Sequence, residues 1–474
     1  MSKKIYGRPI ATPMNPNKLV PSVPTIELFT GKELDGRHNV TIKITETDGE
    51  FITEQVATIT DGQKGEKGDG APDIVCEEAG SVIAIKDSND RQLRGLTIYG
   101  KTTQDDTPTP EAPVELVTAG KSGTIKTIVA GKNLVPYPYY RQELSGNTYT
   151  SPGGIDFTVN ADGSVTANGT NNGTGNDSGQ FLFTDATELW LPVGEYILST
   201  GVDADTNKGW YLMVSMRTGK GESKYAYGGS VKFTVTEAGI GYISWRIREG
   251  NTANNLTIYP QLEVGSVATA YEKPVKTQTL TASTPNGLPG IPVSSGGNYT
   301  DKNGQKWICD EIDFACGVYV QRIKAVNMVD LNGGYNGSNF WFSAIKDKKI
   351  GITNLLCSHY PVLGKSSGAT RRMSGGQDTS NLFIYDPEYS DWDVLRTVCN
   401  DAVILYELAA PIETALSAEE LATYAALHTN KPNTTVYNNA WAEMKLVYNA
   451  DTKTYIDNKF AELQNAILSA GANV

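Results

Sequence analysis

The stretch WYLMVSMR, Trp210 to Arg217, alternates in the way that is typical of a β-strand. Successive side chains of a strand point to opposite faces, so every second residue shares a face. One face carries Trp210, Leu212, Val214 and Met216 and is predicted to face a core. The other face carries Tyr211, Met213, Ser215 and Arg217 and is predicted to face outward.

The same alternation assigns faces to residues 242–248 and 258–263. It predicts that Ile243, Trp245 and Ile247 of the first stretch, and Ile258 and Leu262 of the second, face the core. The outward positions are predicted to form one aromatic, arginine-bearing surface. Sugars bind to aromatic faces and planar polar groups, so we take this surface as a candidate glycan-binding site, made of Tyr211, Arg217, Tyr242, Arg246, Arg248, Tyr259 and Gln261. The alternative is a solvated β face, or a face covered by a neighbouring chain.

The composition favours several β-rich modules. The chain has 474 residues, 48 of them glycine, with 24 tyrosines against 11 phenylalanines. This length exceeds what one core usually organises and favours about three domains, and the residue usage favours turns and half-exposed strands.

The net charge of −12 without a Lys/Arg-rich run argues against nucleic acid as a partner. The start of the chain lacks the apolar core of a signal peptide, and no stretch is long and apolar enough to span a membrane, so we expect maturation in a cytoplasm and no membrane partner.

Few residues offer cofactor or metal chemistry. His38, His359 and His428 are far apart in the sequence, which leaves little material for a triad or a histidine metal site. The five cysteines contain no CxxC pair, so we expect them to be reduced and mostly buried. Residues 203–209 space oxygen ligands like a calcium loop, but Val214 stands where the bidentate Glu belongs, which predicts an ordinary turn. We expect no cofactor and no metal.

Glu311 and Asp313 are the best enzymatic alternative. They lie two residues apart on a predicted strand, so their carboxylates share a face at about 7 Å, within the range for an inverting glycosidase. Strand carboxylates usually sit on solvated faces, however. We therefore expect no enzyme and no catalytic residue, and keep a cell-wall polysaccharide depolymerase as a further alternative.

Both ends of the chain differ from its middle. Proline recurs through residues 1–24 and predicts an extended arm, followed by a small β module at 25–60. Within residues 61–72, Gly62, Gly65 and Gly68 are spaced by three, as in a collagen-like neck, with a flexible linker as the alternative. Ser417 and Glu420 form a capping box that predicts a helix to about His428. In residues 451–474, apolar side chains follow coiled-coil spacing, with a single amphipathic helix as the alternative: Ile456, Phe460, Leu463, Ile467 and Ala470.

Several stretches carry a resemblance to a known family, and they are LRGLTIYGKTTQ (Leu93 to Gln104), NGLPGIPV (Asn286 to Val293), WICDEIDF (Trp307 to Phe314), LYEL (Leu405 to Leu408) and LHTNKP (Leu427 to Pro432). Over about residues 75–460 the chain resembles minor structural and fibre proteins of tailed bacteriophages of Gram-positive hosts. The resemblance implies a β domain made of 73–132 and 275–410, an inserted jelly roll at 133–274, and a helix with closing strands at 411–450. The end of the insert, Leu256 to Glu272, is similar to the closing strand of carbohydrate-binding jelly rolls.

The resemblance also implies partners and a location. We expect a homotrimeric, elongated fibre on the virion surface, assembled in the host cytoplasm, that binds host cell-surface polysaccharide and so mediates host attachment. The arm looks like a virion-docking peptide through Tyr6, Pro9, Pro13 and Pro16, and its partner is a tail, baseplate or capsid protein. A head fibre or capsid decoration protein with no essential sugar site remains the main alternative.

Overall fold

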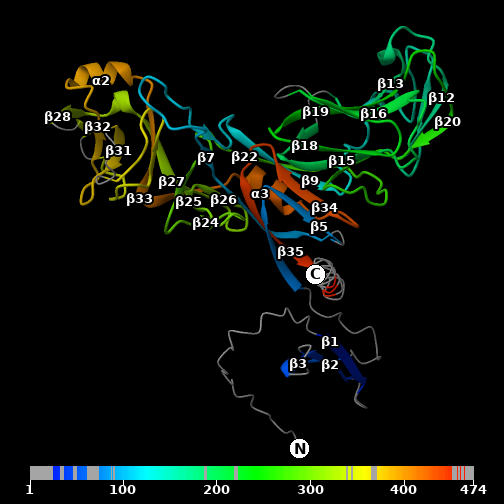
Figure 1. Cartoon of the computed structure of the whole chain (residues 1–474), viewed down its shortest axis with the longest axis horizontal. Coiled ribbons are helices and arrows are strands. Elements are labelled where there is room, and N and C mark those ends of the chain that lie inside the picture. Colours follow the sequence, from blue (N-terminus) through cyan, green and yellow to red (C-terminus); the bar gives the residue numbers. More distant parts are fainter. Residues whose placement is uncertain are drawn as a thin grey trace, which may run out of the picture. The chain divides into compact units, whose positions relative to one another are not determined.

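The computed structural model describes residues 25–32, 37–45, 51–60, 74–86, 88, 91–185, 189–217, 222–337, 340–342, 345–364 and 371–450, and the single positions Ile456, Phe460 and Gln464 (Figure 1). Strands make up 48% and helices 9% of the structure, which confirms the predicted mostly-β class. The chain divides into two compact units, residues 1–72 with 452–474 and residues 73–451. None of the described helices is long and apolar enough to cross a membrane.

The first unit contains a three-stranded antiparallel sheet in the order β1-β2-β3. Its strands are β1 (Thr25–Lys32), β2 (Arg37–Thr45) and β3 (Phe51–Thr60). The predicted arm at 1–24, with Tyr6, Pro9, Pro13 and Pro16, and the collagen-like segment lie outside the described residues. Of the predicted heptad positions, Ile456 and Phe460 are helical and exposed, by 41% and 51% of their surface. The other three lie outside the described part of the chain.

The second unit is built on a seven-stranded sheet, ordered β30-β33-β27-β26-β6-β35-β4. Its strands are β30 (Leu355–Cys357), β33 (Val403–Ala415), β27 (Val318–Asn327), β26 (Glu311–Asp313), β6 (Leu93–Tyr99), β35 (Glu443–Ala450) and β4 (Ile74–Gly80). A four-stranded sheet, β22-β9-β34-β5, joins β22 (Gln278–Ser283), β9 (Thr124–Gly131), β34 (Thr434–Asn438) and β5 (Val82–Ile85). Smaller sheets are formed by β7 (Thr102–Thr103) with β8 (Val117–Thr118), and by β23 (Gly290–Val293), β25 (Lys306–Cys309) and β24 (Tyr299–Thr300).

Residues 411–450 belong to this β domain. We expected a helix with closing strands here, set apart from the β domain of 73–132 and 275–410. In the structure β34 pairs with both β5 and β9, and β35 pairs with both β4 and β6. The predicted capping box is confirmed: α3 (Ala418–Ala425) begins after Ser417, whose hydroxyl accepts from the Glu420 N–H. The helix ends before His428, which instead forms a β-bridge with Gln92.

Residues 133–274 form three antiparallel sheets around one core (Figure 1, cyan to green). The first sheet contains β10 (Thr148–Thr150), β11 (Asp156–Val159), β12 (Val165–Thr170) and β20 (Thr252–Ile258). The second contains β13 (Gln180–Leu182), β14 (Leu189–Leu191), β19 (Gly239–Ile247), β16 (Trp210–Met216) and β17 (Ser223–Ala226). The third contains β18 (Ser230–Val235), β15 (Gly194–Ser199) and β21 (Gln261–Val264). Two short helices, α1 (Tyr140–Ser145) and η1 (Asn176–Gly179), lie between the strands in sequence.

The two ends of this segment lie next to each other. Strand β9 before it pairs with β22 after it. Asn133 donates to the carbonyls of Pro260 and Glu272, and Lys132 forms an ion pair with Glu272 at 2.9 Å. The segment therefore leaves the β domain and returns to it at one point.

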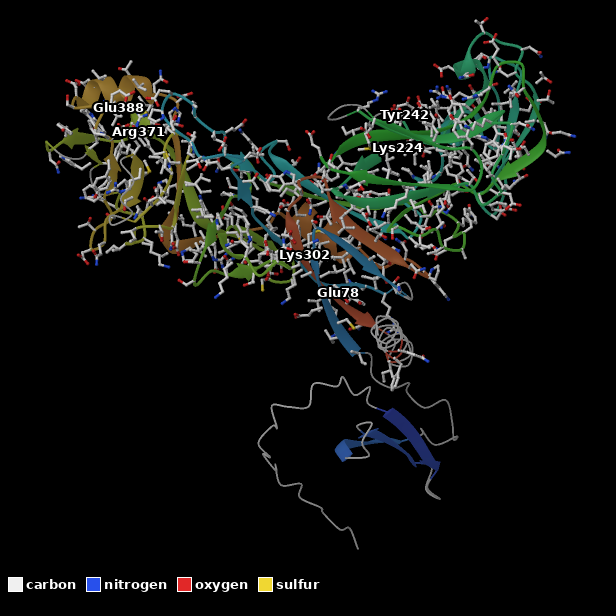
Figure 2. The ribbon with its side chains drawn as sticks, in the orientation of Figure 1. Glu78, Lys224, Tyr242, Lys302, Arg371 and Glu388 are labelled. Carbon is white, nitrogen blue, oxygen red and sulfur yellow. The ribbon has the colours of Figure 1, made fainter. Side chains whose placement is uncertain are left out.

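Residues 328–402 pack with Ile404, Tyr406 and Leu408 of β33 around one core. They contain η2 (Met328–Asp330), β28 (Gly333–Tyr335), β29 (Phe340–Phe342), β31 (Arg372–Gly375), β32 (Leu382–Tyr385) and α2 (Trp392–Val398). Arg371, labelled near Glu388 in Figure 2, binds Asp386 within this region and both carboxylate oxygens of Glu111. Arg371 thereby connects the proline-rich turn at 107–113 to residues 328–402.

The cysteines are as predicted. Cys76, Cys309, Cys357 and Cys399 are buried, Cys316 is exposed, and none of these five forms a disulfide.

Candidate functional site

The inward faces of the predicted strands are confirmed. Trp210, Leu212 and Val214 of β16 are buried, as are Ile243, Trp245 and Ile247 of β19 and Ile258 and Leu262. Their side chains belong to the core of residues 133–274. The outward face differs from the expectation, because Tyr211 and Met213 of β16 are also buried, at 4% and 3% exposure. The outward side chains therefore pack on one another.

Tyrosines and arginines form the packed layer on this outer face. Tyr211 on β16 meets the rings of Tyr225 and Tyr227 edge to face, with centroids 5.2 and 5.7 Å apart. The guanidinium of Arg248 lies over both Tyr211 and Tyr227, at 5.6 and 5.4 Å from the ring centroids. We call Tyr211, Tyr225, Tyr227, Arg246 and Arg248 the tyrosine–arginine cluster.

Arg246 of the cluster lies on β19, directly opposite Tyr211 on one side and Gln180 on the other. Its guanidinium forms an ion pair with Asp177 at 2.6 Å, and the Asp177 side chain is 75% exposed. With the Gln180 amide oxygen facing it, Arg246 also donates to Gln180 from Nε and Nη2, at 3.2 and 3.0 Å. Tyr225 lies on β17, on the other side of β16 from Arg246, and keeps 41% of its surface in solvent.

Tyr242 and Arg217 lie on the same face, further along the strands. Tyr242 is aligned with Ser215 of β16, and the Arg217 guanidinium lies 5.5 Å from the Tyr242 ring centroid. Figure 2 labels Tyr242 on this part of the structure. Five of the seven predicted glycan-binding residues therefore lie in, or directly after, strands of one sheet: Tyr211, Arg217, Tyr242, Arg246 and Arg248.

The prediction was wrong for Tyr259 and Gln261, which lie elsewhere. Tyr259 follows β20, in another sheet, and packs edge to face against Tyr271 at 5.2 Å. Gln261 lies in β21, in a third sheet, is 1% exposed, and binds the Glu263 carboxylate and the Glu272 N–H. Alternation assigns a residue to one face of its own strand, but it does not determine which strands pair.

Sequence reasoning missed four residues of this surface. Tyr225 and Tyr227 come from the stretch SKYAYGG at 223–229, and the same alternation rule would have placed both rings on one face. Asp177 and Gln180 come from η1 and β13, after a Gly/Asn/Thr loop without apolar periodicity. Only strand pairing brings these two beside Arg246.

The side chains of the two alternative sites, the Glu311–Asp313 pair and the loop at 203–209, form hydrogen bonds and ion pairs within the fold. Glu311 forms an ion pair with Arg322 at 2.8 Å and accepts from the Asn298 amide, while Asp313 accepts the Cys316 N–H. In the loop at 203–209, the Asp205 carboxylate accepts the N–H groups of Asn207 and Gly209, which is the geometry of a turn. Among the described residues, no three His, Cys, Asp or Glu side chains are grouped to hold a metal ion.

Searches of this chain against family models, curated proteins and solved structures find no match.

Proposed function

We propose that this chain is a structural fibre protein of a tailed-bacteriophage virion that attaches to glycans of the host surface through the tyrosine–arginine cluster. The proposal joins two independent supports. The stretches between Leu93 and Pro432 resemble fibre and minor structural proteins of such phages. The cluster supplies aromatic rings and planar donors, the two kinds of group that sugar recognition requires.

The observation that carries the glycan proposal is the setting of Arg248. Its guanidinium carbon lies 5.6 and 5.4 Å from the centroids of the Tyr211 and Tyr227 rings, its Nη2 lies 3.4 Å from the Tyr227 hydroxyl, and its buried Nε has no hydrogen-bond partner among the described residues. Contact with two rings reduces the side-chain entropy that is lost when a ligand binds. Arg246 is aligned with Tyr211, and the exposed Tyr225 packs against the same Tyr211 ring. The face therefore offers a ring on which a pyranose can stack and guanidinium groups that can donate to its hydroxyls.

Removing the two arginines should test this site. We expect the full chain with Arg246→Ala and Arg248→Ala to lose at least about tenfold in affinity on an array of bacterial cell-wall polysaccharides, about 1.4 kcal/mol. Hydrogen bonds to charged groups contribute about 1.5–3 kcal/mol each. The cost in folding stability should stay moderate, because Asp177 is 75% exposed although the Arg246 side chain is only 16% exposed, and an Arg–Tyr contact contributes about 0.5–2 kcal/mol.

Two control variants separate binding from folding. Lys232→Ala removes an exposed ion pair with Glu195 on a different sheet and should change neither binding nor melting. Trp245→Ala should lower stability by about 3–5 kcal/mol, because it empties a fully buried position. Unchanged glycan binding by the arginine pair would refute this site. In that case the head-fibre or decoration role takes precedence, and release of reducing sugars from wall polymer would instead indicate a depolymerase.

A further inference from the structure

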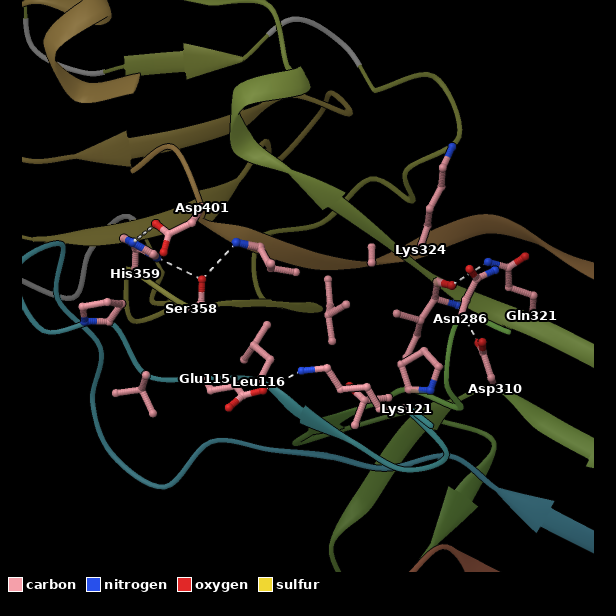
Figure 3. A pocket seen from close by; sticks show the side chains of 18 residues that line it. Glu115, Leu116, Lys121, Asn286, Asp310, Gln321, Lys324, Ser358, His359 and Asp401 are labelled. Carbon is pink, nitrogen blue, oxygen red and sulfur yellow. Dashed lines mark hydrogen bonds and ion pairs between the residues drawn. The ribbon is translucent and has the colours of Figure 1, made fainter. Parts of the chain in front are cut away.

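A serine, a histidine and an aspartate form a hydrogen-bonded chain at a site far from the tyrosine–arginine cluster in sequence. Ser358 Oγ lies 2.9 Å from His359 Nδ1, and His359 Nε2 lies 3.1 Å from Asp401 Oδ1 (Figure 3). Strand β30 ends at Cys357 and pairs with β33, which brings the residues just after one strand beside those just before the other. The Ser358 N–H donates to the Val403 carbonyl and so fixes the approach.

The partners of His359 determine which ring nitrogen carries the proton. Burial lowers the pKa of His359 below its ordinary value, although Asp401 acts in the opposite direction, so the ring is neutral at pH 7. Because Nε2 faces a carboxylate, it must carry the ring proton and donate it to Asp401. Nδ1 is then bare and accepts the proton of the Ser358 hydroxyl. Asp401 thus orients His359 as a base directed at Ser358 Oγ, the arrangement of a hydrolytic triad with the two ring nitrogens exchanged.

The three side chains line a pocket of about 700 Å³ (Figure 3). The aliphatic side chains of Leu116, Ile323 and Leu405 belong to an apolar cluster and line the same pocket. Polar groups also line it, among them the Lys121 ammonium and the Asn286 amide. An aliphatic surface beside a few polar groups suits a ligand with a short apolar part and a polar part.

We propose that Ser358 is a nucleophile that cleaves esters of short aliphatic acids in this pocket, with His359 as its general base and Asp401 as a positioning residue. The acyl chain rests on the aliphatic side chains, and the carbonyl carbon lies at Ser358 Oγ. This activity is independent of glycan binding by the tyrosine–arginine cluster.

The reaction needs no further reactant besides water. Ser358 Oγ attacks the carbonyl carbon while its proton moves to His359 Nδ1, and the bond to the leaving alcohol breaks as that proton is passed to the alcohol oxygen. Water then gives a proton to Nδ1 and attacks the acyl-serine. The acid leaves, and Ser358 Oγ takes the proton back.

The test uses the purified full chain with p-nitrophenyl acetate and p-nitrophenyl butyrate. We expect hydrolysis that falls about a hundredfold to ten-thousandfold in Ser358→Ala and in His359→Gln, the range of general-base catalysis. Asp401→Asn should lower kcat with KM unchanged, because an amide at this position donates to Nε2 and reverses the tautomer, and Asp401→Glu should restore part of the rate. His428→Gln, which alters an exposed histidine elsewhere, should leave the rate unchanged.

A second measurement, on the unaltered chain, tests the nucleophile even if Ser358→Ala fails to fold. Ser358 Oγ also accepts the Val403 N–H, so Ser358→Ala disturbs a strand contact as well as the nucleophile. We therefore expect a fluorophosphonate probe to label the unaltered chain, with the adduct mapped to Ser358 by peptide mass spectrometry. An adduct at Ser358 with hydrolysis lost in folded variants supports the proposal. No hydrolysis by the unaltered chain, rates unchanged in the variants, or an adduct at another residue overturns it.

Discussion

Asp310 shows how one buried carboxyl group can link stability to pH. The residue is 1% exposed, and it accepts hydrogen bonds from the Tyr319 hydroxyl and from the N–H groups of Arg322 and Ile323. Burial is nevertheless the largest effect and raises the pKa of Asp310 to about 6. The folded chain therefore keeps this proton at pH values where the unfolded chain, with an Asp pKa of about 3.9, has lost it.

The sign of the effect on stability follows from this difference. Between about pH 4 and pH 6 the folded state binds more protons at Asp310 than the unfolded state does, so its contribution to stability is full below pH 4 and is lost as the pH rises through 6. Two pKa units correspond to about 3 kcal/mol. Asp310→Asn keeps the acceptor oxygen and removes the titration.

We expect urea unfolding to show the difference directly. From pH 4 to pH 7 the unaltered chain should lose about 3 kcal/mol of unfolding free energy relative to Asp310→Asn, whatever the other carboxylates contribute to both proteins. A constant difference between the two proteins at all pH values would contradict the assignment. Asp391→Asn is a control, because Asp391 caps α2 at the surface.

At the scale of elements, the core of the segment 133–274 also includes side chains of the neighbouring β domain. Ala130 of β9 and Tyr437 of β34 belong to the core of the insert, and Val82 and Ile128 pack against it. All four lie in the strands of the β domain that surround the insertion point. Removing the insert would therefore expose apolar side chains that the full chain keeps buried.

Excision of 133–274 with a short turn between β9 and β22 should leave a β domain that still melts cooperatively, but at a lower temperature. The antiparallel β9–β22 pair supports closure, because a hairpin can replace the whole insert. Replacing Tyr437 by Thr should raise the solubility of the shortened protein and destabilise the full chain. Calorimetry would measure both effects, and loss of cooperative melting in the shortened protein would show that the β domain depends on the insert.

At the scale of the whole molecule, we propose a homotrimer. The spacing of Gly62, Gly65 and Gly68 by three, the heptad spacing in residues 451–474 and the fibre resemblance each favour three chains. The helical residues Ile456 and Phe460, at two of the heptad positions, expose about half of their apolar surface. A helix that presents such residues to solvent is stabilised when they pack against copies of themselves.

Native mass spectrometry of the full chain at micromolar concentration should show a trimer. Ile456→Asp with Phe460→Asp should shift the distribution toward monomer, because it places charges at the packed positions. Leu144→Asp is a control, since Leu144 is an exposed leucine of the insert. A monomer or dimer of the unaltered chain would exclude the trimer and leave the C-terminal segment as a single helix.

The sequence by itself determined the features that depend on neighbours along the chain. Alternation placed Trp245 and Ile247 in a core, the capping box at Ser417 began a helix, and the Asp205 loop formed a turn. Each depends on backbone geometry repeated within a few residues, so a local pattern is enough.

Only the tertiary structure decided which strands pair. Pairing separated Tyr259 and Gln261 from Tyr211, although alternation along the sequence had assigned all three to outward positions. It also placed β34 and β35 between strands from the start of the domain, and it brought Asp401 to His359. Of the three histidines, His359 lies beside a serine and an aspartate that contact its two ring nitrogens. Contacts between distant segments depend on register and sheet order, which are determined by the packing of the whole domain.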